Sequence, residues 1–329
     1  MTDEEIESRL SNCALDGNRG AFAAGTVFGD WRITAFIAKG GTAEAYCAEH
    51  VTLGTAAALK VLAEPLTDSR KARFLREAKL LAELKSSAFP AFHGYGEANG
   101  RPYLAEELLE PGELPTGDHA RAKYLLALCA GLKTLHARGI VHRDVKPANI
   151  LFRKNGEPVI VDLGLAKSVD VPLVPDGVSV VDGKAVGVGT PEYAAPEQFT
   201  GGDITPAADI HALGVLTEKL LERGSGVLAA SEWRRIIRRA TSSIASERYQ
   251  SVEAFATAIR RRHWLRNVAV VAAMAAILIS CWWTFVTVVS PRPNVEQELW
   301  EDLMSRKRAQ EMQQKNFEYF ERLRQMPDR

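Results

Sequence analysis

The chain has 329 residues, which is enough for one two-lobed domain and a further segment. Its 41 basic and 41 acidic residues give a formal net charge of zero, so no overall basic field argues for nucleic acid as a partner. The four cysteines are scattered without Cys-X-X-Cys spacing, and the simplest interpretation is a reduced, cytosolic main domain.

The first quarter of the chain predicts a leader followed by strands and one helix. Residues 1–24 are polar and rich in small side chains without a sustained period, so we expect a flexible leader. Beyond it, apolar alternation predicts three strands. They cover residues 31–37, 45–49 and 55–61. An apolar stripe amid charge then predicts a helix over residues 69–84, and a second amphipathic stripe predicts one over residues 119–138.

The densest group of polar residues lies on two loops joined by a predicted hairpin. Apolar runs at residues 149–152 and 159–161, separated by Asn155-Gly156, would return the second loop beside the first. Two carboxylates, an amide and a lysine then converge. They are Asp144, Lys146, Asn149 and Asp162. Such a set suits phosphoryl transfer, in which a protein mostly positions groups and neutralises charge.

Two motifs at these loops carry a family resemblance. His142-Arg143-Asp144-Val145-Lys146-Pro147-Ala148-Asn149 resembles the catalytic loop of protein kinases, and Asp162-Leu163-Gly164 resembles their Asp-Phe-Gly motif. The Lys-Pro-Ala-Asn continuation is similar to serine/threonine kinases, here of the bacterial membrane-anchored, eukaryotic-like (Hanks) type. The resemblance implies transfer of the ATP γ-phosphoryl group to Ser or Thr hydroxyls of protein substrates.

The resemblance also implies a fold and its divisions. The fold would be α+β and bilobal, over about residues 25–263. A β-rich N-lobe would end at about residue 106, a hinge would cover about residues 107–110, and a helical C-lobe would follow from about residue 111.

The family assigns roles to the residues of the two loops. Asp144 would orient the acceptor hydroxyl and accept its proton, and Lys146 would face charge on the moving phosphoryl group. Asn149 and Asp162 offer the oxygen ligands that Mg²⁺ prefers, with Mn²⁺ as an alternative ion.

Two charged residues outside the loops match the family in the expected order. Ala57-Ala58-Leu59-Lys60 is similar to the family's Val-Ala-Ile-Lys, which assigns Lys60 to the α- and β-phosphates of ATP. Glu77 matches the helix glutamate that pairs with this lysine. An ordinary solvated lysine and glutamate are the alternative for each residue taken alone.

The glycine-rich phosphate loop departs from the family pattern Gly-X-Gly-X-X-Gly-X-Val. This chain has Ala38-Lys39-Gly40-Gly41-Thr42-Ala43-Glu44-Ala45, which keeps the middle glycine alone and adds Gly41. The resemblance assigns Ala38, Lys39, Gly40 and Gly41 to the nucleotide site. Because glycine lets the backbone approach phosphates closely, we expect weakened rather than abolished nucleotide affinity.

The predicted hinge contains one residue that the family does not explain. The backbone of Glu107 and Leu109 would bind adenine, and Leu151 is assigned to the same nucleotide site. Glu106 falls where the family usually has an apolar gatekeeper. A desolvated carboxylate is costly at such a position unless it is paired or protonated.

Residues 189–198 resemble the end of a kinase activation segment, including its Ala-Pro-Glu. Thr190 would hydrogen-bond near Asp144 and help to select a Ser or Thr acceptor. In the preceding segment, Ser168 and Ser179 are the two candidates for a regulatory phosphate, of which we favour Ser179.

Three further residues match structural positions of the family. Asp209 corresponds to the aspartate that braces the catalytic loop. Arg248 corresponds to the late arginine that pairs with Glu197. A closing helix is predicted from residue 251 to about residue 262.

Residues 268–289 contain no charged side chain and predict a membrane helix, because about twenty apolar residues cross a hydrocarbon core of roughly 30 Å. Four arginines precede the span and one closely follows it. They are Arg260, Arg261, Arg262 and Arg266 before it, and Arg292 after it. This bias predicts a single-pass protein of the inner (cell) membrane with a cytoplasmic kinase-like domain and an extracytoplasmic tail. A buried core helix is the alternative.

Residues 290–329 predict a helical tail that begins after Asn294. The tail is too small for a sensor domain with its own core. A homodimer contact, a site for a periplasmic partner and a simple helical stub remain its three alternatives.

Two rival functions belong to other classes. The eroded glycine loop, Ala45 and Glu106 favour a pseudokinase, which would act as a docking module with weak or no phosphotransfer. The apolar span and the tail alone would suit a structural membrane anchor. Nucleotide binding without turnover distinguishes the first rival from an active kinase.

Overall fold

The structure is a computed structural model that describes residues 20–168, 179–181, 184–186, 190–200, 203–222, 227–289 and 295–324. The chain divides into two compact units, Met1–Leu265 and Arg266–Arg329. Residues 1–19 of the expected leader and residues 290–294 and 325–329 of the expected tail lie outside the described residues.

The N-terminal part of the first unit is a six-stranded antiparallel sheet in the order β1-β2-β3-β4-β6-β5. Its strands are β1 Val27–Phe28, β2 Trp31–Lys39, β3 Ala43–His50, β4 Ala56–Leu62, β5 Phe92–Ala98 and β6 Arg101–Glu106. Side chains alternate between the two faces of each strand. On β4, Leu59 and Val61 are therefore buried in an apolar cluster with Phe28 and Tyr46, while Lys60 lies on the other face.

Residues 20–24 lie against this sheet. The Ala21 backbone N–H donates to Glu44 Oε2 at 2.9 Å, and the Phe22 ring meets Phe28 edge-on with centroids 4.8 Å apart. These last residues of the expected leader are therefore packed on the sheet.

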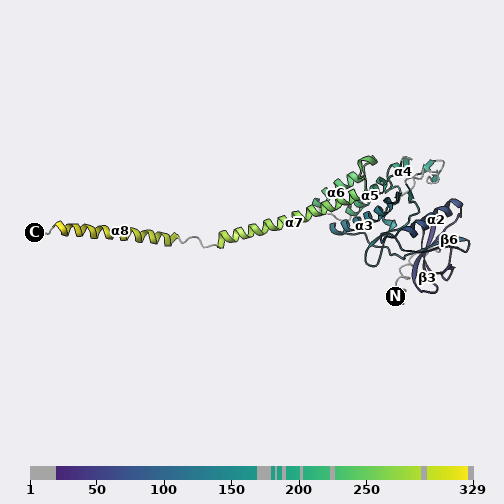
Figure 1. Cartoon of the computed structure of the whole chain (residues 1–329), viewed down its shortest axis with the longest axis horizontal. Helices are drawn as coiled ribbons and strands as arrows, with labels where there is room; N and C mark the ends of the chain where they lie inside the picture. The colour runs from purple at the N-terminus through teal and green to yellow at the C-terminus, as the bar shows by residue number, and fades with distance from the viewer. Residues whose placement is uncertain are drawn as a thin grey trace. The chain divides into compact units, whose positions relative to one another are not determined.

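The first helix that the structure describes, α2 (Asp68–Glu83), packs beside the sheet and confirms the helix predicted over residues 69–84. Thr67 caps it, since its Oγ1 accepts from Arg70 N at 3.4 Å. Phe74 and Leu81 bury the apolar stripe in the main core. Figure 1 shows α2, β3 and β6 together at one end of the first unit.

The C-terminal part of the first unit is helical. Its helices are α3 Asp118–His136, α4 Glu197–Thr200, α5 Ala207–Glu222, α6 Val227–Ala240 and the first turns of α7 Val252–Val289. Leu125 and Leu132 of α3 pack with Leu213 of α5 and Trp233 of α6 in one core, all fully buried. Figure 1 shows these helices on the opposite side of the unit from β3 and β6. The fold is thus α+β with a β-rich and a helical lobe, as the resemblance implies.

Short elements connect these parts. They are β7 Ile140–Val141, η1 Pro147–Asn149, β8 Ile150–Phe152, β9 Pro158–Ile160, β10 Lys167–Ser168, β11 Ser179–Val181, β12 Lys184–Val186 and η3 Ala245–Glu247. Strand β5 and helix α6 were not among the predicted elements. The two candidate phosphosites fall in β10 and β11, and their side chains lie outside the described part of the structure.

The predicted closing helix and the predicted membrane helix form one continuous helix, α7, of 38 residues. Phe255 and Ile259 near its start are fully buried in the core of the first unit. No Gly or Pro interrupts residues 252–289, so nothing in the sequence breaks the backbone hydrogen bonds between the two predicted segments. Residues 263–267, between the two predicted segments, are therefore helical as well.

One stretch of α7 is long and apolar enough to span a membrane. It covers 19 residues, Val270–Val288, with a mean hydropathy of 2.0, and none of it is buried. By length and composition alone this is a candidate span. In the second unit, α8 (Val295–Arg324) confirms the helix predicted in the tail.

Candidate functional site

A short hairpin positions the two loops that carry the predicted acids. β8 pairs with β9 through Ile150 opposite Ile160 and Leu151 opposite Val159. The Val161 N–H donates to the Asn149 carbonyl at 2.9 Å, which extends the pairing up to the loops. The predicted hairpin is thus confirmed.

Asp209 of α5 holds the loop of residues 142–149 through its backbone. Its carboxylate accepts the backbone N–H groups of His142 at 2.9 Å and Arg143 at 2.8 Å, and it contacts His136 Nε2 at 2.8 Å. Arg143 has a φ of 74°, a left-handed conformation that few residues other than glycine adopt. Burial alone would raise the pKa of Asp209, but the hydrogen bonds from His136 and the loop outweigh it and the pKa lies below its usual value. An ionised, fully buried carboxylate therefore holds a strained loop.

Asp144 lies at the centre of a hydrogen-bonded cluster. Its Oδ2 accepts from Lys146 Nζ at 2.7 Å and from Asn149 Nδ2 at 2.8 Å, while its Oδ1 accepts from Thr190 Oγ1 at 3.0 Å. Lys146 Nζ also lies 2.7 Å from Thr190 Oγ1. Burial raises the pKa of Asp144, but Lys146, Asn149 and Thr190 together lower it below its usual value. The structure therefore brings three predicted residues, Lys146, Asn149 and Thr190, together around the ionised carboxylate of Asp144.

Asp162 follows the hairpin with a φ of 65°, the second strained residue of the site. The Gly164 N–H donates to its Oδ1 at 3.1 Å. A Cβ on Gly164 would lie 3.0 Å from Asp162 Oδ1 and 3.2 Å from Glu77 Oε2, so a larger residue would crowd both carboxylates. This close approach explains the glycine of the Asp-Leu-Gly motif.

The donor set at the two loops fits Mg²⁺ rather than a protein-caged metal. In the part of the chain that the structure describes, no three His, Cys, Asp or Glu side chains are grouped to hold a metal ion. Asn149 donates from its amide nitrogen to Asp144, so this bond does not use the amide oxygen, which is the atom that would bind a metal ion. Mg²⁺ commonly takes one or two protein oxygens and completes its shell with water and substrate phosphate.

Lys60 of β4 lies between two carboxylates. Its Nζ is 3.2 Å from Glu77 Oε1 on α2, as predicted, and 2.9 Å from Glu106 Oε1 on β6, which was not predicted. Burial alone would lower the pKa of Lys60, but Glu106, Glu77 and Asp162 raise it above its usual value. Burial raises the pKa of Glu77 to about 7, against the attraction of Lys60. Lys60 is therefore charged and shared between two buried acids.

The strand register explains how Glu106 reaches Lys60. Glu106 lies opposite Ala58 on β4, and Lys60 is the next residue on the same face, opposite Leu104. Long side chains reach such diagonal neighbours, and the small Ala58 leaves Glu106 room to lean across. The sequence shows Lys60 and Glu106 on two strands, but only the register of β4 against β6 shows that they lie on the same face and within reach of each other.

The expected phosphate loop is a hairpin turn between β2 and β3. Ala38 pairs with Ala45 and Lys39 with Glu44, and Lys39 Nζ is 3.1 Å from Glu44 Oε1. The Gly40 N–H donates across the turn to the Ala43 carbonyl at 2.8 Å. The turn thus closes normally although two family glycines are alanine.

Arg70 of α2 holds this turn from outside. Its Nη2 donates to the Gly41 carbonyl at 3.0 Å and to the Thr42 carbonyl at 3.1 Å. Sequence reasoning missed Arg70, because a bond from a side chain to backbone carbonyls leaves no pattern in the sequence. A helix arginine thereby restrains a loop that has lost glycines.

The expected hinge follows β6. The Glu107 N–H donates to the Ala91 carbonyl at 2.8 Å, and both oxygens of its carboxylate accept from Arg153 at 2.8 Å. Leu109 is buried in a small apolar cluster with Val161 and packs against Leu151. The two leucines assigned to the nucleotide site are therefore neighbours, while the Glu107 side chain is occupied elsewhere.

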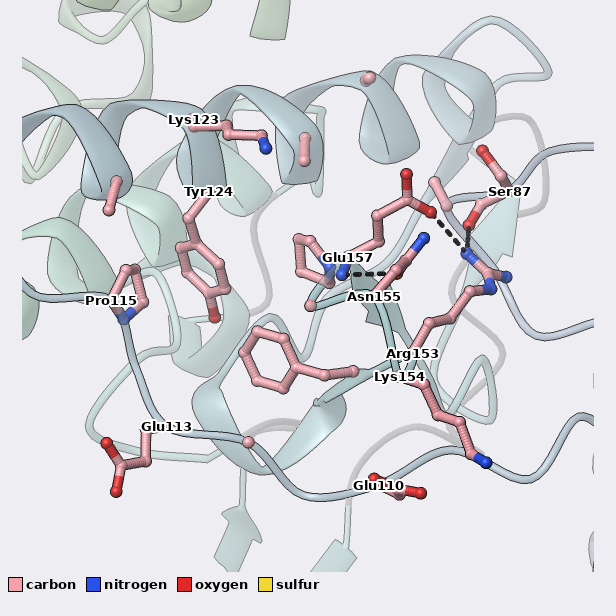
Figure 2. Close-up of a pocket in the computed structure, with 18 of the residues that line it drawn as sticks. Ser87, Glu110, Glu113, Pro115, Lys123, Tyr124, Arg153, Lys154, Asn155 and Glu157 are labelled. Carbon is pink, nitrogen blue, oxygen red and sulfur yellow. Dashed lines mark hydrogen bonds and ion pairs between the residues drawn. The ribbon is translucent and has the colours of Figure 1, made fainter.

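A cavity of about 630 Å³ lies behind the hinge. Figure 2 shows Tyr124 of α3 projecting into it, with Arg153, Lys154 and Asn155 of the β8–β9 turn on the other side. The Tyr124 and Phe152 rings stack there with centroids 6.0 Å apart. Its lining includes none of the residues predicted to bind nucleotide or metal, so this cavity is separate from the Lys60 and Asp144 clusters.

The predicted pair of Arg248 and Glu197 is confirmed. Arg248 is fully buried and donates from both terminal nitrogens to the Glu197 carboxylate, at 2.7 and 2.8 Å. It also donates to the carbonyls of Ala207 and Ser242. This fork fixes α4 and the start of α5 to the loop before α7.

Comparison with known proteins adds a family. The protein kinase domain family matches residues 31–280. The serine/threonine-protein kinase pkn2 of Myxococcus xanthus is 36% identical over 208 residues, 59% of this chain and 24% of pkn2. PknL of Mycobacterium tuberculosis is 33% identical over 220 residues, 62% of this chain and 52% of PknL.

The fold has a counterpart among solved structures. The crystal structure of the Mycobacterium tuberculosis PknI kinase domain matches with a TM-score of 0.56 and 23% sequence identity, and the match covers 74% of this chain and 100% of the PknI domain. At this identity the likeness shows the fold alone. The matched region spans between about a quarter and a half of the length of the two curated relatives.

Proposed function

This chain belongs to the protein kinase domain family, and from that premise we propose that it transfers the γ-phosphoryl group of ATP to Ser or Thr hydroxyls of protein substrates. The observation that carries the proposal is the Asp144 cluster, in which Lys146, Asn149 and Thr190 all donate to one ionised carboxylate. Both relatives are named serine/threonine-protein kinases, which supports the same activity.

In this proposal Asp144 accepts the proton of the acceptor hydroxyl. A lowered pKa keeps Asp144 ionised at neutral pH, so it has an acceptor lone pair ready for that hydroxyl. Lys146 contacts both Asp144 and Thr190, and from there its ammonium group faces the charge of the phosphoryl group in transit. Thr190 fills the space beside Asp144 and favours a small aliphatic hydroxyl over a bulky phenol.

ATP and Mg²⁺ are the cofactors that the family uses, and the residues of this chain fit both. Lys60, held by Glu77, would bind the nucleotide phosphates, with the turn of Ala38, Lys39, Gly40 and Gly41 above them. The backbone of Glu107 and Leu109 would bind adenine against Leu151. Asn149 and Asp162 would hold Mg²⁺, which when bound neutralises phosphate charge, and Mn²⁺ suits the same oxygen ligands.

We also propose the division of the chain into parts. A kinase domain of about residues 25–263 comprises an N-lobe to about residue 106, a hinge at about 107–110 and a C-lobe from about 111. Residues 268–289 are the transmembrane helix, and residues 290–329 form an extracytoplasmic tail.

The protein is then a single-pass protein of the cell membrane with a cytoplasmic kinase domain. The support is the apolar window of α7 and the arginines that precede it. The tail serves a homodimer contact or a periplasmic partner, since α8 exposes Leu299, Leu303 and Phe320.

Two observations favour a second candidate, a docking module without turnover. Glu106 already occupies Lys60, and two glycines of the phosphate loop are alanine. Against it, the lysine, the helix glutamate, the catalytic aspartate and both metal ligands are all present.

The test uses the full chain in lipid nanodiscs with γ-labelled ATP, Mg²⁺ and a generic basic protein. Lys60→Met is the loss-of-function control. We expect label on the substrate, recovered after acid hydrolysis as phosphoserine or phosphothreonine, and its loss in the variant. Phosphotyrosine, or no label from a folded chain that binds ATP, would contradict the proposal.

A further inference from the structure

Glu106 is a buried carboxylate at the inner end of β6, immediately before the hinge, and only 4% of it is exposed. A carboxylate in such a place needs a charged partner, because its desolvation is costly. Among the ion pairs of the described residues its partner is Lys60, at 2.9 Å. That distance is shorter than the one from Lys60 to Glu77, at 3.2 Å.

The lysine that should bind phosphate therefore has fewer free donors than usual. An ammonium group carries three N–H donors. Glu77 and Glu106 each lie within hydrogen-bond distance, which leaves one donor for a nucleotide phosphate. Asp162 adds a third carboxylate to the same surroundings. Phosphate oxygens that approach Lys60 are therefore repelled by the carboxylates around it.

We propose that Glu106 is a positioning residue that competes with the nucleotide phosphates for Lys60 and so lowers the affinity of the chain for ATP. The inference rests on the proposed function in one respect, namely that this site takes a nucleotide polyphosphate. Glu77 holds Lys60 from the helix side, so Lys60 keeps its position when Glu106 releases it. The competition concerns phosphate, and it leaves the adenine contacts of the hinge unchanged.

The test compares a nucleotide with its nucleoside. The full chain in lipid nanodiscs is titrated calorimetrically with the Mg²⁺ complex of the non-hydrolysable analogue AMP-PNP and, separately, with adenosine. The variants are Glu106→Gln, which keeps the shape, and Glu106→Leu, which restores an apolar residue. Glu97→Gln is the matched control, since it removes one exposed carboxylate from the neighbouring strand β5.

We expect both Glu106 variants to bind the analogue on the order of tenfold more tightly, as a freed charge-assisted hydrogen bond allows. Adenosine affinity should stay within about twofold, and Glu97→Gln should change neither. In a Lys60→Met background, replacing Glu106 should lose most of its effect. In transfer assays the KM for ATP should fall while kcat holds.

Three results would overturn the inference. They are an unchanged or weaker affinity for the analogue, a parallel change for analogue and adenosine, and no binding of the analogue by any variant. The titrations need no turnover, so they separate this inference from the proposed activity. A chain that shows the expected affinities but transfers no phosphoryl group overturns only the activity.

Discussion

At the scale of single residues, charge is placed in this molecule so that buried acids remain ionised. Asp144 and Asp209 are both buried, and both have a lowered pKa because hydrogen-bond donors outweigh burial. Glu77 differs, because burial prevails and raises its pKa to about 7. Asp144 and Asp209 of the C-lobe are therefore ionised hydrogen-bond acceptors. The ammonium group of Lys60, in contrast, interacts with several carboxylates at once.

We predict that Asp209→Asn destabilises the fold by about 2 to 4 kcal/mol, because it weakens hydrogen bonds to two buried backbone N–H groups. The pKa of Asp209 is lowered in the folded state, so its contribution is present above the unfolded pKa of about 3.9 and is lost as pH falls through the folded value. Denaturation midpoints of wild type and variant at pH 7 and pH 3 measure both effects.

The difference in midpoint between wild type and Asp209→Asn should be largest at pH 7 and should begin to shrink only as pH falls below about 4. Asp203→Asn, at an exposed position, is the control and should change stability little. A gap that widens in acid would contradict the assignment of Asp209 as an ionised brace.

At the scale of elements, α2 serves the expected nucleotide site twice. Arg70 restrains the phosphate turn and Glu77 binds Lys60, and their spacing of seven positions, about two turns, places both on one face of the helix. A displacement of α2 would therefore loosen the turn and the lysine together.

Replacing Arg70 by Met should raise the KM for ATP by about threefold to tenfold, since two hydrogen bonds to the turn are lost. The value of kcat should change little, because Arg70 touches neither the Asp144 cluster nor Asp162. Steady-state kinetics of label transfer measure both constants. Lys79→Met, at an exposed position of the same helix, should leave them unaltered, and an equal effect of both substitutions would refute the role of Arg70.

A second element-scale prediction concerns Arg248. Its planar fork serves Glu197 and backbone carbonyls, and an ammonium group cannot reproduce that geometry. Arg248→Lys should therefore lower the free energy of unfolding by about 3 kcal/mol.

The control for Arg248 is the exposed pair of Lys219 and Glu192. Lys219→Ala should lower the free energy of unfolding far less than Arg248→Lys does, because exposed ion pairs contribute little. Chemical denaturation of the three proteins compares them directly. Similar losses for both substitutions would show that the buried fork has no special role.

At the scale of the whole molecule, α7 joins the core of the first unit to the apolar window Val270–Val288. We predict that Ile279→Lys, near the centre of the window, reduces the membrane-bound fraction after carbonate extraction. A lysine at the centre of a membrane helix costs roughly 2.5 to 3.5 kcal/mol. Gln313→Lys in α8 should stay membrane-bound, and equal behaviour of the two variants would contradict the span.

Much of this molecule was predictable from its sequence, and the misses have physical causes. The Asp144 cluster, the pair of Lys60 and Glu77, and the fork of Arg248 were predicted because their motifs occur in order along the chain. The pairing of Glu106 with Lys60 was not predicted, because it depends on the register of β4 against β6.

Two other misses follow from long-range or absent signals. Arg70 binds backbone carbonyls, which carry no residue-specific pattern. The continuity of α7 was missed because the apolar pattern changes at about residue 265, from one buried stripe to an entirely apolar surface, while the backbone simply continues.

The central claim is phosphoryl transfer at Asp144, and single-turnover label transfer by the full chain in lipid nanodiscs tests it most directly. Wild type and Asp144→Asn are compared at saturating labelled ATP with Mg²⁺, and nucleotide affinity is measured for both. We predict equal affinity and a rate at least about 100-fold lower in the variant, the usual contribution of a general base. A wild type that binds ATP without transferring label, or a variant as fast as wild type, would contradict the account.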